Sequence, residues 1–222
     1  MKKLLSVSLM CTDLMNVEKD IHILEDNHVD WFHLDVMDAH FVPNLTFGPD
    51  FIKQLRNVTD VPFDIHVMLE KPEVLLNYLT LSAKDYVTVH SELPDDEIQK
   101  SIDLIKEKGA HVGLAFNPET PVEKAAKFLP QVDLVLLMLV KPGFAGGKMI
   151  EGIMDKVAAT KKYLQEHGLE HVLISTDGNI TVERAAAMAK MGADVFVGGT
   201  SAVYRKGMDL KDTIPAFYQA VS

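Results

Sequence analysis

Short apolar runs alternate along the chain with stretches in which apolar residues recur every three or four positions. Eight runs have the length and composition of buried β-strands, namely Leu4–Leu9, Trp31–Val36, Pro62–Val67, Tyr86–His90, His111–Phe116, Leu134–Val140, His171–Thr176 and Asp194–Gly198. Helical spacing lies between them, as at Ile98, Ile102 and Ile105. Eight strand–helix units in 222 residues predict an α/β fold, a single (β/α)8 TIM barrel over residues 1–222, with an open doubly wound sheet as the alternative.

Proline and aspartate mark where several of the helices are expected to begin. Pro72 and Pro121 suit the first turn of a helix, because proline lacks the N–H group that would be unpaired there. Asp95 or Asp96 suits a capping position, because a carboxylate accepts hydrogen bonds from the first N–H groups of a helix. A further helical repeat begins at Ile150.

Four of the predicted strands are polar on one face, although a parallel strand covered on both sides is usually apolar throughout. Side chains alternate with period two along a strand, so each face can be taken directly from the sequence. The four polar faces consist of Ser6, Ser8 and Met10; His33, Asp35 and Met37; Asp64, His66 and Met68; and Leu173, Ser175 and Asp177. We expect these faces to point into the barrel, with the functional site at their C-terminal ends.

Two histidines and two aspartates on these faces are candidate metal ligands. Taken singly, a strand histidine such as His33 is more often a hydrogen-bonded structural residue, and an aspartate such as Asp35 or Asp177 can cap a helix. His90, at the end of the fourth predicted strand, is open to either a ligand or a structural role. Several ionisable groups at one barrel mouth are different, because a divalent cation offsets the cost of burying them. The set His33, Asp35, His66 and Asp177 therefore predicts one divalent metal ion, with Zn²⁺, Fe²⁺ or Mn²⁺ favoured by the mixed nitrogen and oxygen donors.

Four methionines fall at or just after predicted strand ends: Met10, Met37, Met68 and Met138. Methionine is a flexible and polarizable filler of irregular core space, which is one interpretation of each residue. As a set near one barrel mouth, they could instead form a water-poor wall around reacting carboxylates.

Three glycine-containing turns after late strands are candidate phosphate sites. They are Pro142–Gly147, Asp177–Asn179 and Gly198–Ser201, and each precedes a stretch with helical spacing. Glycine lets backbone amides approach a phosphate closely, and a helix start adds the positive end of its dipole. Phosphate sites after the seventh and eighth strands are common in barrels, and Pro142–Gly147 is long enough to form a closing lid.

Composition and charge exclude several classes of partner. With 22 basic and 32 acidic residues the net charge is −10, which argues against nucleic acid and anionic membranes. No stretch reaches the roughly 18 apolar residues of a membrane span, and Asp13 interrupts the N-terminal apolar run before a signal-peptide core is complete. The only cysteine, Cys11, excludes an internal disulfide, so we expect a cytoplasmic protein.

Five segments resemble, in order, the motifs of one enzyme family. Residues 33–44, His-Leu-Asp-Val-Met-Asp-Ala-His-Phe-Val-Pro-Asn, are similar to the signature of ribulose-phosphate 3-epimerases, and residues 64–68, 141–146, 176–178 and 198–201 resemble that family's later motifs. The resemblance covers essentially the whole chain. It implies a (β/α)8 barrel that inverts C3 of a phosphorylated ketose with a bound divalent metal ion, and it suggests a homo-oligomer.

Matched residue by residue, the resemblance implies roles for individual side chains. Asp35 and Asp177 would be the two acid/base carboxylates, and together with His33 and His66 they would bind the metal ion. The substrate would be contacted by Ser8, His66, Gly143, Phe144, Ala145, Gly146, Gly178, Gly199 and Thr200. The expected reaction converts D-ribulose 5-phosphate to D-xylulose 5-phosphate.

Four positions depart from the usual family pattern. Ala39 stands where Gly is usual, Lys141 where Asn or Asp is usual, Gly147 in place of Gln, and Asn179 in place of a second Gly. Lys141 either contacts the substrate or stays solvated, as most lysines do. Residues 8–11, 41–45 and 117–121 resemble the allulose 6-phosphate 3-epimerase branch at least as closely, so a hexulose phosphate is the alternative substrate.

Two other activities are compatible with such a barrel. An aldolase or synthase acting on a similar sugar phosphate would also pass through an enediolate. A non-catalytic barrel that binds a sugar phosphate would keep the pocket without turnover, but the intact pair Asp35 and Asp177 argues against it.

Overall fold

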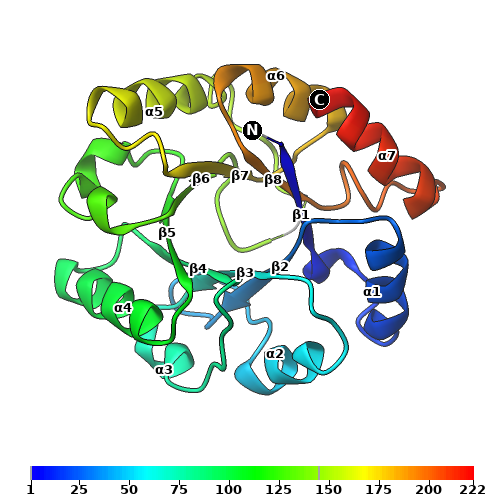
Figure 1. Cartoon of the computed structure of the whole chain (residues 1–222), viewed down its shortest axis with the longest axis horizontal. Helices are drawn as coiled ribbons and strands as arrows, with labels where there is room; N and C mark the ends of the chain where they lie inside the picture. Colours follow the sequence, from blue (N-terminus) through cyan, green and yellow to red (C-terminus); the bar gives the residue numbers. More distant parts are fainter. Residues whose placement is uncertain (1, 145) are drawn as a thin grey trace.

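Eight parallel strands close into a barrel in the order of the sequence (Figure 1). The computed structural model describes residues 2–144 and 146–222. The strands are β1 (Leu4–Ser8), β2 (Trp31–Met37), β3 (Phe63–Met68), β4 (Tyr86–His90), β5 (His111–Phe116), β6 (Leu134–Met138), β7 (Leu173–Asp177) and β8 (Val195–Gly198). The closed order confirms the (β/α)8 barrel and excludes the open doubly wound sheet.

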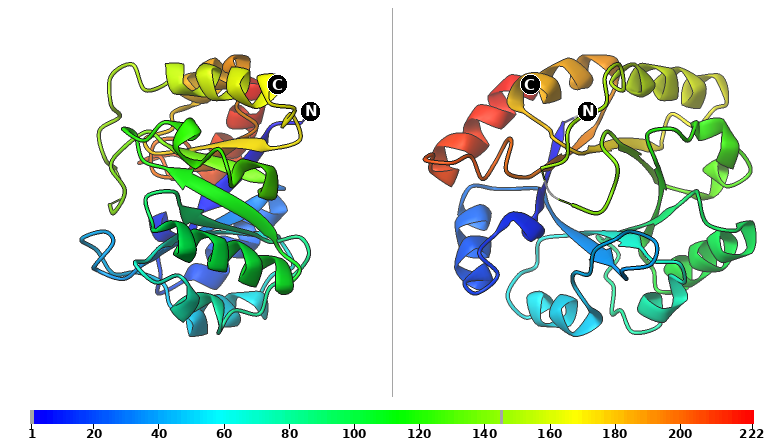
Figure 2. Two further views of the ribbon diagram at one scale, coloured as in Figure 1. Left: turned by 90° about the vertical axis from the view of Figure 1, so that its left-hand side faces the viewer. Right: turned by 180° about the vertical axis from the view of Figure 1, so that it is seen from behind.

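Helices form a ring around the barrel, which is visible from both ends (Figures 1 and 2). They are α1 (Val17–Asp26), α2 (Pro49–Arg56), α3 (Glu73–Leu76), α4 (Asp95–Glu107), α5 (Asp155–Glu166), α6 (Val182–Met191) and α7 (Leu210–Val221), with 3-10 turns η1 (Leu9–Cys11), η2 (Val122–Ala125) and η3 (Leu129–Gln131). No helix in these described ranges combines the length and the apolar character that a membrane crossing requires.

The connection between β5 and β6 contains 3-10 turns, although eight complete strand–helix units predicted an α-helix there. Pro121 precedes η2 instead of starting an α-helix. Pro130 lies in η3, where a continuous α-helix would clash with its ring and lack its N–H group. Lys156 of α5 supports the connection, because its Nζ donates to the carbonyl oxygens of Asn117 and Thr120, both at 2.6 Å.

Two predicted helix starts are also corrected by the structure. Helix α5 begins later than Ile150, because Gly152 adopts φ +75° and interrupts any helix between them. Helix α4 is preceded by Pro94, so neither Asp95 nor Asp96 is its cap. Both aspartates lie in the first turn, where negative charge is stabilised by the positive end of the helix dipole.

Side chains of the strands divide between a helix-facing core and the barrel interior, as the alternation predicted. Phe32 and Leu34 belong to the helix-facing core. The interior contains a second apolar cluster that includes Trp31, Leu134 and Val195, each the first residue of its strand. On β1, β2 and β7 the polar residues Ser8, Asp35 and Asp177 come at or near the C-terminal end of the strand.

Four aspartates fasten the opposite, N-terminal end of the barrel in one repeated way. Each precedes an even-numbered strand and accepts a hydrogen bond from a backbone N–H of the odd-numbered strand before it. The pairs are Asp30 with Leu5 (2.9 Å), Asp85 with Phe63 (2.8 Å), Asp133 with Val112 (2.9 Å) and Asp194 with Ile174 (3.2 Å). Hydrogen bonds to an ionised acceptor are stronger than neutral ones, so this end is well suited to hold the barrel closed.

Candidate active site

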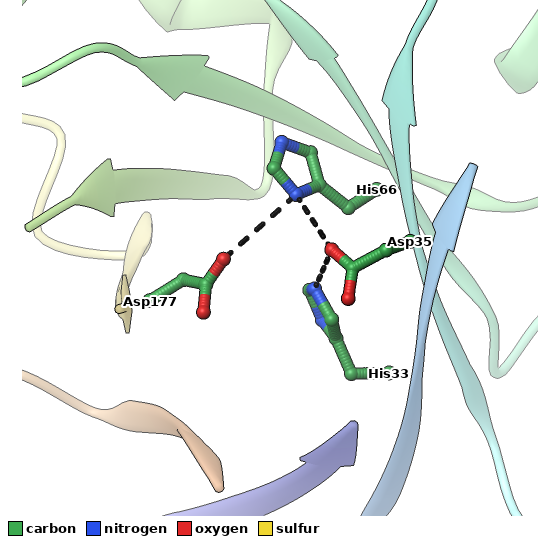
Figure 3. A group of neighbouring side chains, drawn as sticks. All are labelled: His33, Asp35, His66 and Asp177. Carbon is green, nitrogen blue, oxygen red and sulfur yellow. Dashed lines mark hydrogen bonds and ion pairs between the residues drawn. The ribbon is translucent and has the colours of Figure 1, made fainter. Parts of the chain in front are cut away.

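The strand register brings the four predicted metal ligands together at the C-terminal end of the barrel (Figure 3). Asp35 on β2 pairs with His66 on β3, and two residues earlier His33 pairs with Asp64. Asp177, the last residue of β7, faces them from across the mouth (Figure 3). One ligand atom from each of the four residues lies within 4.8 Å of all the others.

His33 is held between two carboxylates. Its Nδ1 donates to Oδ2 of Asp64 at 2.7 Å, and its Nε2 faces Oδ1 of Asp35 at 3.1 Å. The hydroxyl of Ser6 donates to the same Asp64 oxygen at 2.8 Å. Burial disfavours a charged imidazole, but Asp35 and Asp64 outweigh burial and raise the pKa of His33 well above its ordinary value. The two carboxylates therefore stabilise a positive charge at Nε2 of His33.

His66 is oriented by a buried relay of hydrogen bonds. Its Nε2 lies 2.8 Å from Nε2 of His90, and Nδ1 of His90 lies 2.8 Å from Oε2 of Glu92. Burial lowers the pKa of His90 to about 4. Burial also opposes ionisation of Glu92, but hydrogen bonds from His90 and Thr120 outweigh it and lower the pKa of Glu92 to about 2.

The relay assigns the protons of both imidazoles. Ionised Glu92 accepts the Nδ1 proton of neutral His90, so Nε2 of His90 accepts a proton from Nε2 of His66. Nδ1 of His66 is then left unprotonated, and it is buried without a hydrogen-bond partner among the described residues. A buried nitrogen with a free lone pair is the form in which histidine binds metal ions.

A divalent cation fits this donor set. Nδ1 of His66 faces Oδ1 of Asp35 at 3.3 Å and Oδ2 of Asp177 at 4.0 Å. Lone pairs that face one another in a buried cluster are costly, and a cation at their centre would satisfy them together. Both histidines direct their other ring nitrogen to a hydrogen-bond partner, which is the usual support around a metal ion.

The two aspartates hold protons with different strength. Burial raises the pKa of a carboxyl group, but at Asp35 the neighbours His33 and His66 outweigh burial and keep the pKa well below its ordinary range. At Asp177, burial and the negative charge of Asp35 act in the same direction and raise the pKa to about 7. One carboxyl group is therefore suited to accept a proton, and the other to hold one.

A pocket opens in front of the two aspartates. Of the predicted substrate-binding residues, its lining includes Ser8, Gly143, Phe144, Gly146, Gly178, Gly199 and Thr200. His66 is fully buried and is not part of the lining, and Ala145 lies outside the described residues. Ser8 donates a hydrogen bond to Asp35 at 3.2 Å. Met10, Met37, Met68 and Met138 all line the pocket, which favours their interpretation as a water-poor wall.

The β6–α5 loop borders the pocket, and the β2–α2 loop packs against that loop. The β2–α2 loop and the β6–α5 loop project from the same side of the barrel (Figure 2, left). They contact each other where Nδ2 of Asn44 donates to the carbonyl oxygen of Gly143 at 2.7 Å. The turn after β7 packs closely against Val140. A Cβ at Gly178 would lie 2.7 Å from Cγ2 of Val140, and Gly178 also has φ +114°.

The predicted helix start after β8 is absent. Helix α7 begins at Leu210, and the chain after Gly199 forms a single turn in which the N–H of Val203 donates to the Gly199 carbonyl at 2.9 Å. Helix α6 does follow the β7 turn closely, and Thr181 caps it by accepting from the N–H of Arg184 at 3.3 Å. The turn after β8 can therefore present backbone N–H groups to an anion, but it lacks the positive end of a helix dipole.

Comparison with known proteins places this chain in a family. The profile of the Ribulose-phosphate 3 epimerase family matches residues 4–204. The chain belongs to this family. The ribulose-phosphate 3-epimerase of Bacillus subtilis (strain 168) is 38% identical over 197 residues, which cover 89% of this chain and 90% of that protein. The enzyme of Treponema pallidum (strain Nichols) is 39% identical over 197 residues, covering 89% of each chain.

Solved structures of other enzymes share the barrel with this epimerase. A 3-hexulose-6-phosphate synthase superposes with a TM-score of 0.64 at 17% identity, covering 100% of both chains. KGPDC from Streptococcus mutans superposes with a TM-score of 0.71 at 13% identity, covering 100% of this chain and 98% of that one. At these identities the likeness concerns the fold alone, so it lends no support to a synthase activity.

The four departures from the family pattern have different places in the epimerase. Ala39 and Asn179 adopt φ +61° and +51°, a region that glycine enters without strain, which explains why glycine is usual at both positions. Gly147 accepts a hydrogen bond from the side chain of Asn179 at 2.9 Å. Lys141 is exposed and does not belong to the pocket lining.

Three residues of the site had no role assigned from the sequence. His90 was left open between ligand and structural residue, and it contacts His66 without joining the ligand set. Asp64 lies two residues before His66, on the same interior face of β3. Glu92 lies two residues after His90, in the turn that follows β4. That shared alternation was the only signal in the sequence for either carboxylate.

Replacing Glu92 with Gln should weaken metal binding by the epimerase about 10–100-fold, the usual cost of losing a group that supports a ligand. An amide can donate to Nδ1 of His90, which would reverse the relay and place a proton on Nδ1 of His66. Competition with a chromophoric zinc chelator measures the affinity, with Glu107→Gln on the exposed side of α4 as the control. Equal affinities for the two variants would show that the relay does not set this proton.

Proposed function

We propose that this protein is a metal-dependent 3-epimerase that interconverts D-ribulose 5-phosphate and D-xylulose 5-phosphate. The observation that carries the proposal is the pair Asp35 and Asp177, which face each other across the pocket from β2 and β7. Inversion at one carbon needs proton transfer on both of its faces, and two facing carboxyl groups supply it. The relatives named above are ribulose-phosphate 3-epimerases, which favours this substrate over allulose 6-phosphate.

In the proposed reaction each carboxyl group moves one proton. Asp35, whose low pKa keeps it ionised, removes the C3 proton from one face of the ketose. Asp177, which faces Asp35 from the other side of the pocket, delivers a proton to the other face. The roles exchange in the reverse direction. A divalent metal ion held by His33, Asp35, His66 and Asp177 would supply Lewis-acid stabilisation of the negative charge that develops on the substrate oxygens.

The rest of the pocket is suited to the phosphate and to exclusion of water. Gly178, Gly199 and Thr200 line the same pocket as the aspartates, and glycine leaves backbone N–H groups open to an anion. The four methionines leave little room for water beside the reacting carbon. The β6–α5 loop is proposed to close over the bound sugar, which would protect the enediolate from bulk water.

The direct test is incubation of the purified, metal-loaded protein with D-ribulose 5-phosphate in heavy water. We expect xylulose 5-phosphate, detected with a coupling enzyme, and deuterium at C3, detected by NMR. Faster turnover of allulose 6-phosphate would support the hexulose alternative, and carbon–carbon bond formation with an added aldehyde would indicate an aldolase. Binding without exchange for every ketose phosphate would indicate a non-catalytic barrel.

Several attributes complete the proposal. The native metal is Zn²⁺, Fe²⁺ or Mn²⁺, because two of the four donors are imidazoles. The chain forms a single domain over residues 1–222 and assembles as a homo-oligomer. A reducing cytoplasm suits a chain whose only cysteine, Cys11, can form no internal disulfide. Elemental analysis tests the metal, and light scattering tests the assembly.

Replacing Lys141 with Asn should change kcat/KM by less than about twofold, because substitutions on the exposed surface have small effects. The side chain is exposed outside the pocket, so we expect no change in the preference between ribulose 5-phosphate and allulose 6-phosphate. Steady-state kinetics on both sugars provide the measurement. A tenfold shift in the ratio of the two values would mean that Lys141 reaches the substrate after all.

A further inference from the structure

The side chain of Asn179 connects three segments at the mouth of the barrel. Its Nδ2 donates to the carbonyl oxygen of Gly147 in the β6–α5 loop at 2.9 Å. Its Oδ1 accepts from Oγ of Ser201, in the turn after β8, at 3.2 Å and from Nη1 of Arg184, on α6, at 2.7 Å. One amide group therefore uses both of its ends to join segments that lie far apart in the sequence.

The backbone conformation does not by itself require asparagine at this position. Asn179 has φ +51°, in the left-handed region that asparagine tolerates and glycine enters freely. A glycine would satisfy the turn equally well. What asparagine adds is the amide, and with it the hydrogen bonds to the neighbouring loops.

Arg184 places a positive charge against Asn179, a residue that lines the pocket. Within the described ranges, no lysine or arginine side chain is part of that lining, whereas Asp35 and Asp177 are. Nη1 of Arg184 donates to the carbonyl oxygen of Asn179 at 2.8 Å as well as to its side-chain oxygen. Arg184 is half-buried as a residue, so its charge is less screened by solvent than that of an exposed side chain.

We propose that Asn179 and Arg184 are positioning residues for the phosphate group of the substrate, a role that rests on the proposed placement of phosphate at the turns after β7 and β8. Arg184 provides positive potential behind the N–H groups of these turns. Asn179 holds the two turns and the β6–α5 loop in one arrangement. A phosphate dianion binds best where fixed N–H groups and positive charge coincide.

The test measures binding of inorganic phosphate by calorimetry and steady-state kinetics with D-ribulose 5-phosphate, both on the full-length, metal-loaded protein. Arg184→Met removes the charge, and Arg184→Lys retains it without the planar fork. Asn179→Gly removes the amide and keeps the backbone free of strain. Lys190→Met, at the exposed end of the same helix, is the matched control for loss of a positive charge.

We expect Arg184→Met and Asn179→Gly each to weaken phosphate binding and to raise KM about tenfold, the scale of one hydrogen bond to a charged group. The value of kcat should stay within about twofold, because the lost interaction serves ground state and transition state alike. Arg184→Lys should recover part of the loss, and Lys190→Met should match the wild type. The double variant should be little worse than either single variant, since the two side chains act as a unit.

Unchanged phosphate affinity in both variants, with unchanged melting temperatures, would overturn the proposal. A loss that appears in kcat and metal content, with KM unaltered, would also overturn it, because it would indicate damage to the metal-binding cluster. If the wild type fails to epimerise ribulose 5-phosphate but phosphate affinity still falls in the variants, the proposed reaction fails and the positioning role stands. Normal turnover of ribulose 5-phosphate by the wild type, with unaltered phosphate binding in the variants, would support the reaction and overturn the positioning role.

Discussion

Replacing Asp177 with Asn should lower the rate of C3 epimerisation at least about 10²–10⁴-fold, the usual contribution of one general acid or base. The amide can neither hold nor return a proton at the face that Asp177 serves, and it binds a metal ion less well than a carboxylate. The barrel should remain folded, because Asn has nearly the same shape. Comparison of kcat at equal metal occupancy measures the effect, and Asp50→Asn on the exposed surface of α2 is the control.

Isotope exchange separates the two carboxyl groups in the same variant. With Asp35 intact, Asp177→Asn should still exchange the C3 hydrogen of one epimer with heavy water while forming little of the other epimer. The reciprocal variant Asp35→Asn should favour exchange of the opposite epimer. Activity of Asp177→Asn within a few-fold of the wild type would contradict proton transfer by two carboxyl groups.

Replacing His66 with Ala should lower metal affinity by more than about 100-fold. Loss of a group that only supports a ligand already lowers metal affinity about 10–100-fold, and the loss of a proposed ligand should cost more. The substitution deletes the buried Nδ1 atom that has no hydrogen-bond partner among the described residues and that faces the carboxyl groups of Asp35 and Asp177. Elemental analysis after dialysis measures the remaining metal. His22→Ala on the exposed side of α1 is the matched control.

Metal content and activity should fall together in His66→Ala and recover together when excess metal is added. Full metal occupancy after dialysis would assign His66 a structural or substrate-contacting role. A variant that loses metal and also unfolds would be replaced by His66→Gln, which fills more of the buried space and keeps a polar contact to His90.

The grouping of the candidate ligands was predictable because it depends on strand periodicity and parallel register. Alternation places His33 and Asp35 on one face of β2 and His66 on one face of β3, and the register then sets Asp35 directly beside His66. No detail of side-chain packing enters that inference. The same periodicity placed the apolar positions of β2 against the helices.

The surroundings of the cluster were less predictable, because they depend on how side chains reach across elements. Glu92 reaches Nδ1 of His90 from a turn, and Arg184 folds back from a helix onto Asn179. Neither contact follows from a periodic pattern. The absence of an α-helix between β5 and β6 was also not predictable, because one proline can mark either a helix start or a helix end.

The aspartates at the N-terminal end of the barrel divide the chain into four modules of two strands each. Their bonds to the preceding strand span 25, 22, 21 and 20 residues, so every module is tied within itself. Closing such short loops costs less chain entropy than joining distant parts of the sequence. A fragment that ends after an even-numbered strand keeps all of its ties, whereas one that ends after an odd-numbered strand leaves a backbone amide without its carboxylate. The four candidate ligands, by contrast, lie on the first, second and fourth modules, so the proposed metal site forms only when these three modules have packed together.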